Sequence, residues 1–145
     1  MNISYRQATK EESTLIRSLL ESHKLPTETV GTSITDFYLA IAIGEIAGVA
    51  GFEYYGENAL LRSVAVPASL QNKQIGSHLV DWMCSLAAQK GMKRIVLLTE
   101  TASKFFARKG FRVVDRSSID NEAMKKSSQF CGGCCSSAAC MKLDL

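Results

Sequence analysis

The stretch of sequence that decides the fold is Leu60–Val80, LLRSVAVPASLQNKQIGSHLV. It begins as an apolar strand, continues as a short polar loop and ends in the first turns of a helix. The loop has few side chains suited to covalent chemistry, but backbone N–H groups at a helix N-terminus bind anions. Gly76 lets the backbone approach an anion closely, and Lys73 adds a cation at the rim. The stretch predicts a site for a phosphate-bearing ligand, although an ordinary strand-to-helix loop explains it equally well on local sequence alone.

The composition is that of one domain of ordinary size. The chain has 145 residues, of which 46% are apolar and 21% charged, so it can bury a core and is not a candidate for disorder. The formal net charge is +3, and no run of Lys and Arg is longer than a pair such as Lys125-Lys126. This balance suits a ligand rich in phosphate and argues against a nucleic-acid partner.

The sequence lacks the usual signals for export and membrane insertion. Residues 1–30 have no apolar signal-peptide core, and the longest apolar runs, such as Tyr38–Ile43, are too short to span a bilayer. The five cysteines are an odd number without a secretion signal, which argues against a disulfide framework. We therefore expect a cytoplasmic protein with no membrane partner.

The N-terminal half has the pattern of a helix followed by an antiparallel meander. Thr9 and Glu12 form a capping box ahead of apolar residues at helical spacing. Turn signals at Gly44-Glu45 and Gly56–Asn58 separate three β-rich segments. The expected elements are a strand at Ile3–Gln7, a helix over 10–23, a loop over 27–35 and strands over 37–43, 46–55 and 59–66.

The C-terminal half begins with a βαβ unit. Apolar spacing predicts a helix over 77–90, and Arg94–Leu98 is typical of a strand buried on both faces. This order implies a right-handed crossover and a parallel strand pair. The remaining expected elements are a helix over 101–108, a strand over 111–114, a short helix over 118–126 and a strand over 138–143. The expected fold class is α+β: one domain over 1–145 whose mixed sheet joins an antiparallel N-terminal meander to a central parallel βαβ unit.

Three separate motifs resemble those of one known family. Gln71–Gly76, QNKQIG, resembles the (Gln/Arg)-x-x-Gly-x-(Gly/Ala) acetyl-CoA loop of GNAT N-acetyltransferases. Ser63–Val66, SVAV, resembles the family's fourth strand, and Phe105–Phe111, FFARKGF, resembles its aromatic-x-x-x-Gly-Phe signature. The expected order of elements is also that of the family. The resemblance implies the GNAT acyl-CoA N-acyltransferase fold over almost the whole chain.

The resemblance also implies an activity, and parts of the chain resemble two subgroups of the family. It implies transfer of acetyl from acetyl-CoA to the amine of a small molecule, an amino acid or an amino-acid analogue, by direct attack in a ternary complex. No metal is expected, and Cys84 lies on the predicted βαβ helix, an unsuitable place for a nucleophile. Leu97–Ala102 and the chain end resemble the acetyltransferase domain of N-acetylglutamate synthases. Leu60–Val66 and the pattern Ser137-Ala138-x-Cys140-Met141 resemble small acetyltransferases associated with arsenic resistance.

The residues expected to hold acetyl-CoA come from the three motifs, together with Ser77 after the loop and Thr101 after the parallel strand. They are Val64, Ala65, Val66, Gln71, Asn72, Lys73, Gln74, Ile75, Gly76, Ser77, Thr101, Phe105 and Phe106. Gln74 stands where the pattern has its first Gly, so we expect weaker or reshaped CoA binding, because a side chain restricts φ. Phe106 stands where the family often has a tyrosine that protonates the CoA thiolate, so that role is vacant or filled elsewhere.

Charged residues on two strands are the candidates for chemistry at the acceptor. Glu53 is the expected base, acting through water, and the competing interpretation is a solvent-exposed carboxylate. Arg62 either clamps a substrate carboxylate or pairs with Glu53 across the hairpin. Glu100 and Thr101 follow a parallel strand, where open α/β sheets bind ligands, although Thr101 is also expected to cap the next helix.

A cysteine cluster near the chain end leaves alternatives open. Cys131, Cys134 and Cys135 have a spacing compatible with a soft metal or As(III), or they are free thiols, and Cys140 is expected to pack as a small apolar residue. Gln74 and Phe106 also leave open a catalytically weak acyl-CoA-binding or thiol/metalloid-sensing module on the same fold. Acceptors at protein N-termini or lysines, and a homodimer through terminal strands, stay open as well.

Overall fold

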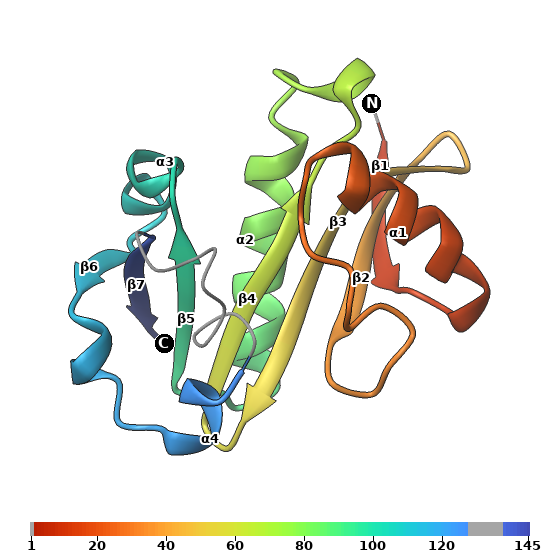
Figure 1. Ribbon diagram of the computed structural model, residues 1–145. Helices are drawn as coiled ribbons and strands as arrows, with labels where there is room; N and C mark the ends of the chain where they lie inside the picture. The colour runs from red at the N-terminus through yellow and green to blue at the C-terminus, as the bar shows by residue number, and fades with distance from the viewer. Residues whose placement is uncertain (1, 128–137) are drawn as a thin grey trace. The chain divides into compact units, whose positions relative to one another are not determined.

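The computed structural model describes residues 2–127 and 138–145, and Figure 1 shows its helices and strands. Among these residues, seven strands form one mixed sheet in the order β1-β2-β3-β4-β5-β7-β6. The strands are β1 Ile3–Gln7, β2 Asp36–Ala42, β3 Glu45–Tyr55, β4 Asn58–Ala65, β5 Arg94–Thr99, β6 Arg112–Val114 and β7 Ala139–Asp144. The helices are α1 Ser13–Ser22, α2 Ile75–Gln89, α3 Ser103–Arg108 and α4 Glu122–Lys125, with single 3-10 turns η1 Lys10–Glu12, η2 Ala68–Leu70 and η3 Arg116–Ser118.

The contacts divide the chain into two compact units. Unit 1 comprises Met1–Glu53 and Ser63–Ser85, and unit 2 comprises Tyr54–Arg62 and Leu86–Leu145. In the part of the chain that the structure describes, no helix combines the length and the apolar character needed to cross a membrane.

Unit 1 is an antiparallel meander with a helix packed on each face. β1 pairs with β2 and β2 pairs with β3, both antiparallel. Successive side chains of a strand point to opposite faces, so alternate residues of β2 meet different helices. On the α1 side the buried cluster contains Ile16, Leu20, Val30, Phe37, Leu39, Val49 and Ala65. On the other face the Tyr38 ring lies 5.7 Å from the Trp82 ring of α2, which stacks on Tyr5 at 5.4 Å.

The hairpin between β2 and β3 turns one residue earlier than expected. Ile43 and Gly44 form its two-residue loop, with φ of +53° and +72°, and β3 begins at Glu45. Positive φ at both loop residues is the pattern of a type I′ hairpin, whose twist matches that of the flanking strands. A β-branched residue rarely adopts this conformation, which is why sequence alone placed the turn at Gly44-Glu45.

Unit 2 contains the parallel strand pair. Residues 58–60 of β4 pair in parallel with residues 94–96 of β5, as the βαβ pattern predicts. β7 then pairs antiparallel with β5 on one side and with β6 on the other. The last strand of the chain therefore lies between two strands that precede it. The buried cluster of unit 2 contains Leu60, Val96, Ile119, Met124 and Cys140.

The predicted helix over 118–126 differs most from the structure. Residues 116–118 form a 3-10 turn, and α4 begins at Glu122, four residues after the expected start at Ser118. Asn121 is its N-cap, because the side chain accepts a hydrogen bond from Met124 N–H at 3.0 Å. Asn121 also donates to the Tyr55 carbonyl at 2.9 Å, so a contact distant in sequence decides where this short helix begins.

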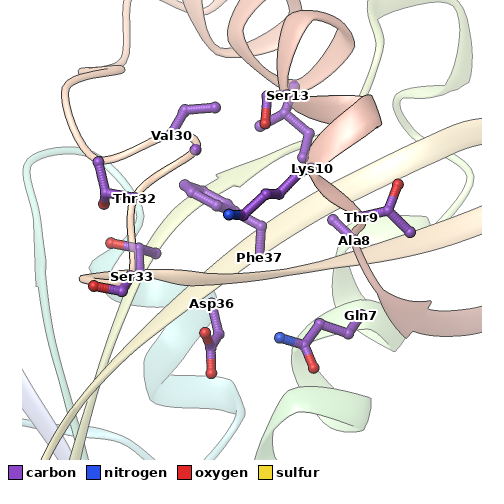
Figure 2. A pocket seen from close by; sticks show the side chains of 13 residues that line it. Gln7, Ala8, Thr9, Lys10, Ser13, Val30, Thr32, Ser33, Asp36 and Phe37 are labelled. Atoms are coloured by element: carbon purple, nitrogen blue, oxygen red, sulfur yellow. The ribbon is translucent and has the colours of Figure 1, made fainter.

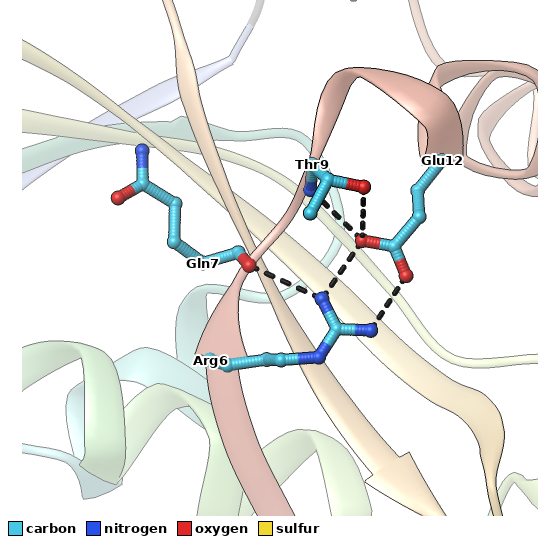
Figure 3. Close-up of polar contacts among 4 residues, drawn as sticks. All are labelled: Arg6, Gln7, Thr9 and Glu12. Carbon is cyan, nitrogen blue, oxygen red and sulfur yellow. Dashed lines mark hydrogen bonds and ion pairs between the residues drawn. The ribbon is translucent and has the colours of Figure 1, made fainter.

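The capping box ahead of α1 is present and carries an ion pair (Figure 3). Glu12 Oε1 accepts from Thr9 N–H at 2.8 Å, and the two carboxylate oxygens accept from Arg6 at 2.8 and 2.6 Å. The Arg6 hydrogen bonds, followed by that from Thr9, lower the pKa of Glu12 to about 2. Paired N–H···O bonds of this kind fix orientation as well as charge, so the group connects the end of β1 to the start of α1.

We predict that Glu12 stabilises the protein in a pH-dependent way. Its pKa is lower in the folded chain than in the unfolded chain, so the stabilisation is fully present above about pH 5 and is lost as the pH falls toward 2. Denaturant unfolding of wild type and Glu12→Gln should differ by a constant free energy from pH 7 to 5. That difference should shrink below pH 4. Glu21→Gln, at an exposed position of α1, is the control and should show no such trend.

Candidate functional site

The loop before α2 has an unusual backbone. Asn72 and Gln74 have φ of +65° and +63°, whereas Lys73 between them is not in the left-handed region. Residues alternating between the two hands turn successive N–H groups toward one side, which creates a concavity that binds anions. The first intrahelical hydrogen bond of α2 runs from His78 N–H to Gln74 C=O at 3.1 Å. The N–H groups of Ile75 and Gly76 precede it and have no intrahelical acceptor.

The loop is anchored at both ends by contacts inside unit 1. Gln71 Nε2 donates to the Val66 carbonyl at 3.1 Å, and it lies 3.1 Å from Nε2 of His23, the C-cap of α1. At the other end Ile75 is buried, with 2% of its surface exposed. Between these anchors the side chains of residues 71–74 are exposed. The loop thus combines a held backbone with an open face.

The packing of the protein itself does not require a glycine at position 76. A Cβ built at Gly76 would meet only Val66 Cγ2, at 3.5 Å, which is ordinary van der Waals contact. The protein itself therefore has room for a side chain here, unlike at Gly51, where a Cβ would lie 2.8 Å from Thr35. Gly76 also lies within α2 and has no positive φ, so neither strain nor internal packing requires a glycine at this position.

Ser63 interrupts β4 just before the predicted acetyl-binding residues Val64, Ala65 and Val66. It has φ of +59° inside the strand, in the left-handed region. Such a residue within a strand is typical of a bulge, where the regular ladder of hydrogen bonds is broken and the strand twists more strongly. The peptide groups next to Ser63 therefore depart from the direction they would have in a regular strand.

Glu53 is buried, so the interpretation of it as a solvent-exposed carboxylate is wrong. Only 1% of its surface is exposed. The Thr35 hydroxyl lies 3.4 Å from Glu53 Oε2 and 2.9 Å from the hydroxyl of Thr29, and both threonines are buried as well. Across the described residues no buried side-chain nitrogen or oxygen is left without a hydrogen-bond partner.

A pocket of about 250 Å³ opens in unit 1, and Thr35 lines it whereas Thr29 does not (Figure 2). Figure 2 shows Lys10 from η1 extending across it beside Phe37. Its polar lining residues include Lys10, Ser13, Thr32, Ser33, Thr35 and Asp36. Thr35 therefore borders the pocket on one side and faces Glu53 on the other.

Unit 2 holds the remaining predicted site residues. Arg62 is buried on β4, with 3% of its surface exposed, whereas Glu100 and Thr101 are exposed after β5. The expectation that Thr101 caps the next helix is wrong. Ala102 is the N-cap of α3, and its N–H donates to Thr99 Oγ1 at 3.0 Å. The Thr99 hydroxyl, and not that of Thr101, therefore makes the hydrogen bond at the start of α3.

Phe105 and Phe106 belong to an aromatic cluster at α3. The Phe106 ring meets Phe105 edge-on at 5.0 Å and Phe111 at 5.5 Å between centroids. Lys109 Nζ lies 5.8 Å from the centroid of the Phe105 ring. Phe106 is buried and Phe105 is half-buried. The cluster contributes apolar packing between α3 and the residue that precedes β6.

The cysteines that the structure describes do not form a metal site. Cys140 is buried in the core of unit 2, as expected, and burial raises the pKa of its thiol. No group of three metal-ligating side chains occurs within residues 2–127 and 138–145. Cys131, Cys134 and Cys135 lie outside the described residues.

Sequence reasoning missed Thr29, Thr35, Ser63 and the anchor between Gln71 and His23. The two threonines lie in the Thr/Ser/Gly-rich passage, which carries no periodic signal. Ser63 lies in a segment whose apolar character predicts a regular strand. None of these roles can be inferred from local sequence, because each depends on a partner distant along the chain or on a backbone angle.

We predict that Gln74→Gly stabilises the protein by about 1 kcal/mol, because a non-glycine residue in the left-handed region carries a steric cost of this order. Asn72→Gly should give a smaller gain, since asparagine tolerates this conformation. Ser69→Gly, at an exposed position without positive φ, should lower stability. Denaturant unfolding measures all three, and a loss of stability in Gln74→Gly would contradict the strain at this residue.

The chain matches known proteins over most of these elements. Residues 33–113 match the family model described as the acetyltransferase (GNAT) domain. An uncharacterized N-acetyltransferase of Chlorobaculum tepidum, CT2212, is 30% identical over 94 residues, which are 64% of this chain and 60% of that protein. The chain thus matches less than two thirds of the length of this relative.

Solved structures show the same fold. Rv2747 from Mycobacterium tuberculosis, in complex with CoA, has a TM-score of 0.80 at 21% identity, over 98% of this chain and 99% of that one. N-acetylglutamate synthase from Neisseria gonorrhoeae, complexed with CoA and N-acetyl-glutamate, has a TM-score of 0.83 at 18% identity, over 100% of this chain and 35% of that one. The family model covers more than half of the sequence, and the protein therefore belongs to the GNAT acetyltransferase family.

Proposed function

We propose that this protein is an acetyl-CoA-dependent N-acetyltransferase whose acceptor is the amine of a small molecule, an amino acid or an amino-acid analogue. The observation that carries the proposal is the left-handed backbone at Asn72 and Gln74 leading into the N-terminus of α2. This geometry presents several N–H groups to one anion, and an exposed loop of this kind with one cation is suited to a pyrophosphate. Residues 71–77 hold the pyrophosphate in this proposal, with Lys73 at the rim.

The backbone of Val64, Ala65 and Val66 binds the acetyl and pantetheine groups. Attack by an amine on the thioester carbonyl creates an oxyanion, which needs a hydrogen-bond donor aimed at it. The left-handed Ser63 turns the neighbouring peptide groups out of the regular strand direction, which favours such a role for Val64 N–H. The proposal also assigns Phe105 and Phe106 to contacts with CoA, on their match to the family's motif, and Thr101, on its position after the parallel strand β5.

Glu53 acts as the base, and Arg62 binds a carboxylate of the acceptor. A buried carboxylate with a hydroxyl neighbour can hold a proton away from bulk water. An arginine side chain presents paired N–H donors that match a carboxylate, which is why an amino-acid acceptor fits Arg62. N-acetylglutamate synthase, which shares the fold, is a protein crystallised with an acylated amino acid.

We predict release of the CoA thiol when the protein is given acetyl-CoA and a panel of L-amino acids, with the acetylated product identified by mass spectrometry. Arg62→Lys should raise KM for the best amino acid about tenfold or more, because lysine lacks the paired donors. It should leave KM for the matching amino-acid amide unchanged. Binding of CoA by calorimetry without turnover on any amine would overturn the proposal.

We predict that Phe106→Tyr does not raise turnover. The Phe106 ring is buried and packs against Phe105 and Phe111, so a new hydroxyl there would lose its hydration. That loss should lower the free energy of unfolding by about 1–3 kcal/mol. Phe105→Tyr, on a half-buried ring, is the matched control and should cost less. A gain in kcat for Phe106→Tyr would instead mean that the vacant proton-donor position is competent.

A further inference from the structure

Glu53 lies at one end of a short hydrogen-bonded series that continues through the buried hydroxyl groups of Thr35 and Thr29. All three residues lie in unit 1. Thr35 Oγ1 is 3.4 Å from Glu53 Oε2 and 2.9 Å from Thr29 Oγ1. The exposed fractions of Thr29, Thr35 and Glu53 are 5%, 4% and 1%. Groups this buried exchange protons with solvent only through a hydrogen-bonded route or by a movement of the chain.

The numbers of donors and acceptors on these groups determine the direction of the hydrogen bonds between them. A threonine hydroxyl has one proton to donate, and an ionised carboxylate can only accept. When Glu53 is charged, the Thr35 proton points to Glu53 and the Thr29 proton points to the Thr35 oxygen. When Glu53 is protonated, it can donate to Thr35, and Thr35 then donates to Thr29. The same three groups therefore satisfy both protonation states of Glu53 without moving.

Thr35 is held in the position that this series requires. Its methyl group packs on Gly51 of β3 so closely that a Cβ built at Gly51 would lie 2.8 Å from Thr35 Cγ2 and 3.1 Å from Phe37 Cε1. Thr35 also lines the pocket of about 250 Å³, whereas Glu53 is not among the residues that line it. Thr35 thus contacts the buried carboxylate and also lines a space open to water.

The chemistry proposed above requires such a route. An ammonium acceptor has three N–H protons and the amide product has one, so the nitrogen loses two protons as the C–N bond forms and the C–S bond breaks. One proton is taken up by the departing thiolate, and the other must reach solvent. If Glu53 takes one of these protons, it must return that proton to water or to the thiolate before the next turnover.

We propose that Thr35 is the positioning residue of Glu53, and that it passes the proton of Glu53 to Thr29 and onward to solvent. The Glu53 carboxylic acid gives its proton to Thr35 Oγ1, the Thr35 proton passes to Thr29 Oγ1, and the Thr29 proton passes to a water molecule. Both hydroxyl groups are thereby regenerated, Glu53 returns to carboxylate, and the water carries the proton to solvent. This inference rests on the proposed role of Glu53 as base.

The test uses the full chain, acetyl-CoA and the L-amino acid with the highest turnover in the panel described above. Thr35→Val removes the hydroxyl and keeps the shape, and it should lower kcat about 10- to 100-fold while leaving KM for acetyl-CoA unchanged. Thr35→Ser restores the hydroxyl and should recover most of kcat. In a Glu53→Gln background, Thr35→Val should cause no further loss, which a merely structural role would not produce.

Two further variants keep the result interpretable. Thr14→Ala removes an exposed hydroxyl of α1 that does not line the pocket and is not part of the hydrogen bonds described above, so kcat should stay within twofold of wild type. If Thr35→Val does not fold, Thr29→Val interrupts the same series one step further on and should lower kcat in the same direction.

The outcomes separate this inference from the proposed function. Loss of activity in Glu53→Gln with full activity in Thr35→Val, or in Thr29→Val where that variant is the one used, overturns the role of Thr35 alone. Full activity in Glu53→Gln, or no turnover by wild type, overturns both. Equal losses from Thr35→Val in the wild-type and Glu53→Gln backgrounds mean that Thr35 only supports the loop, and they also overturn the inference.

Discussion

The backbone between β4 and α2 is the constraint on which the candidate ligand site depends. The strand ends at Ala65 and the helix begins at Ile75, and the connecting loop reaches the helix through left-handed residues at Asn72 and Gln74. Right-handed residues at both positions would turn the loop's N–H groups in other directions and remove the concavity. Asparagine adopts this conformation readily, whereas glutamine does not, so Gln74 is held there by its surroundings. The buried side chain of Ile75 and the Gln71 hydrogen bond to Val66 provide that restraint.

This restraint explains why a loop without the expected first glycine can keep its geometry. The family pattern has glycine at this position, and this chain has glutamine there with φ of +63°. A glycine would reach the conformation at little steric cost, but it would also gain more freedom in the unfolded chain. Gly76, in contrast, is not required by backbone or packing, because a Cβ there would make only one ordinary contact. The two positions of the motif thus differ in physical origin: one concerns the backbone angle and the other concerns space on the ligand side.

The fold was largely predictable from the sequence, and the candidate site was predictable only in part. Strands such as Ile3–Gln7 and the parallel β4–β5 pair follow from side-chain periodicity and element order, which are local signals. The boundaries that were wrong depended on nonlocal or strained features, namely the Asn121 contact with Tyr55 and the left-handed Ile43. The burial of Glu53 was missed for a similar reason. A carboxylate on a meander strand normally faces solvent, whereas Glu53 is buried and has the Thr35 hydroxyl of the 27–35 loop beside it.

The burial of Glu53 also accounts for two threonines of the 27–35 loop, a segment without helical or strand periodicity. A carboxylate taken out of water requires hydrogen-bond donors close by, and a hydroxyl supplies one without adding a second charge. Thr35 meets this need, and Thr29 supports it from within the same loop. The approach of Thr35 in turn requires the absence of a side chain at Gly51, so a glycine in the middle of β3 is explained by contact rather than by a turn. The buried Glu53 and the packing around it therefore link residues of the 27–35 loop to residues of β3. Sequence periodicity does not show this link.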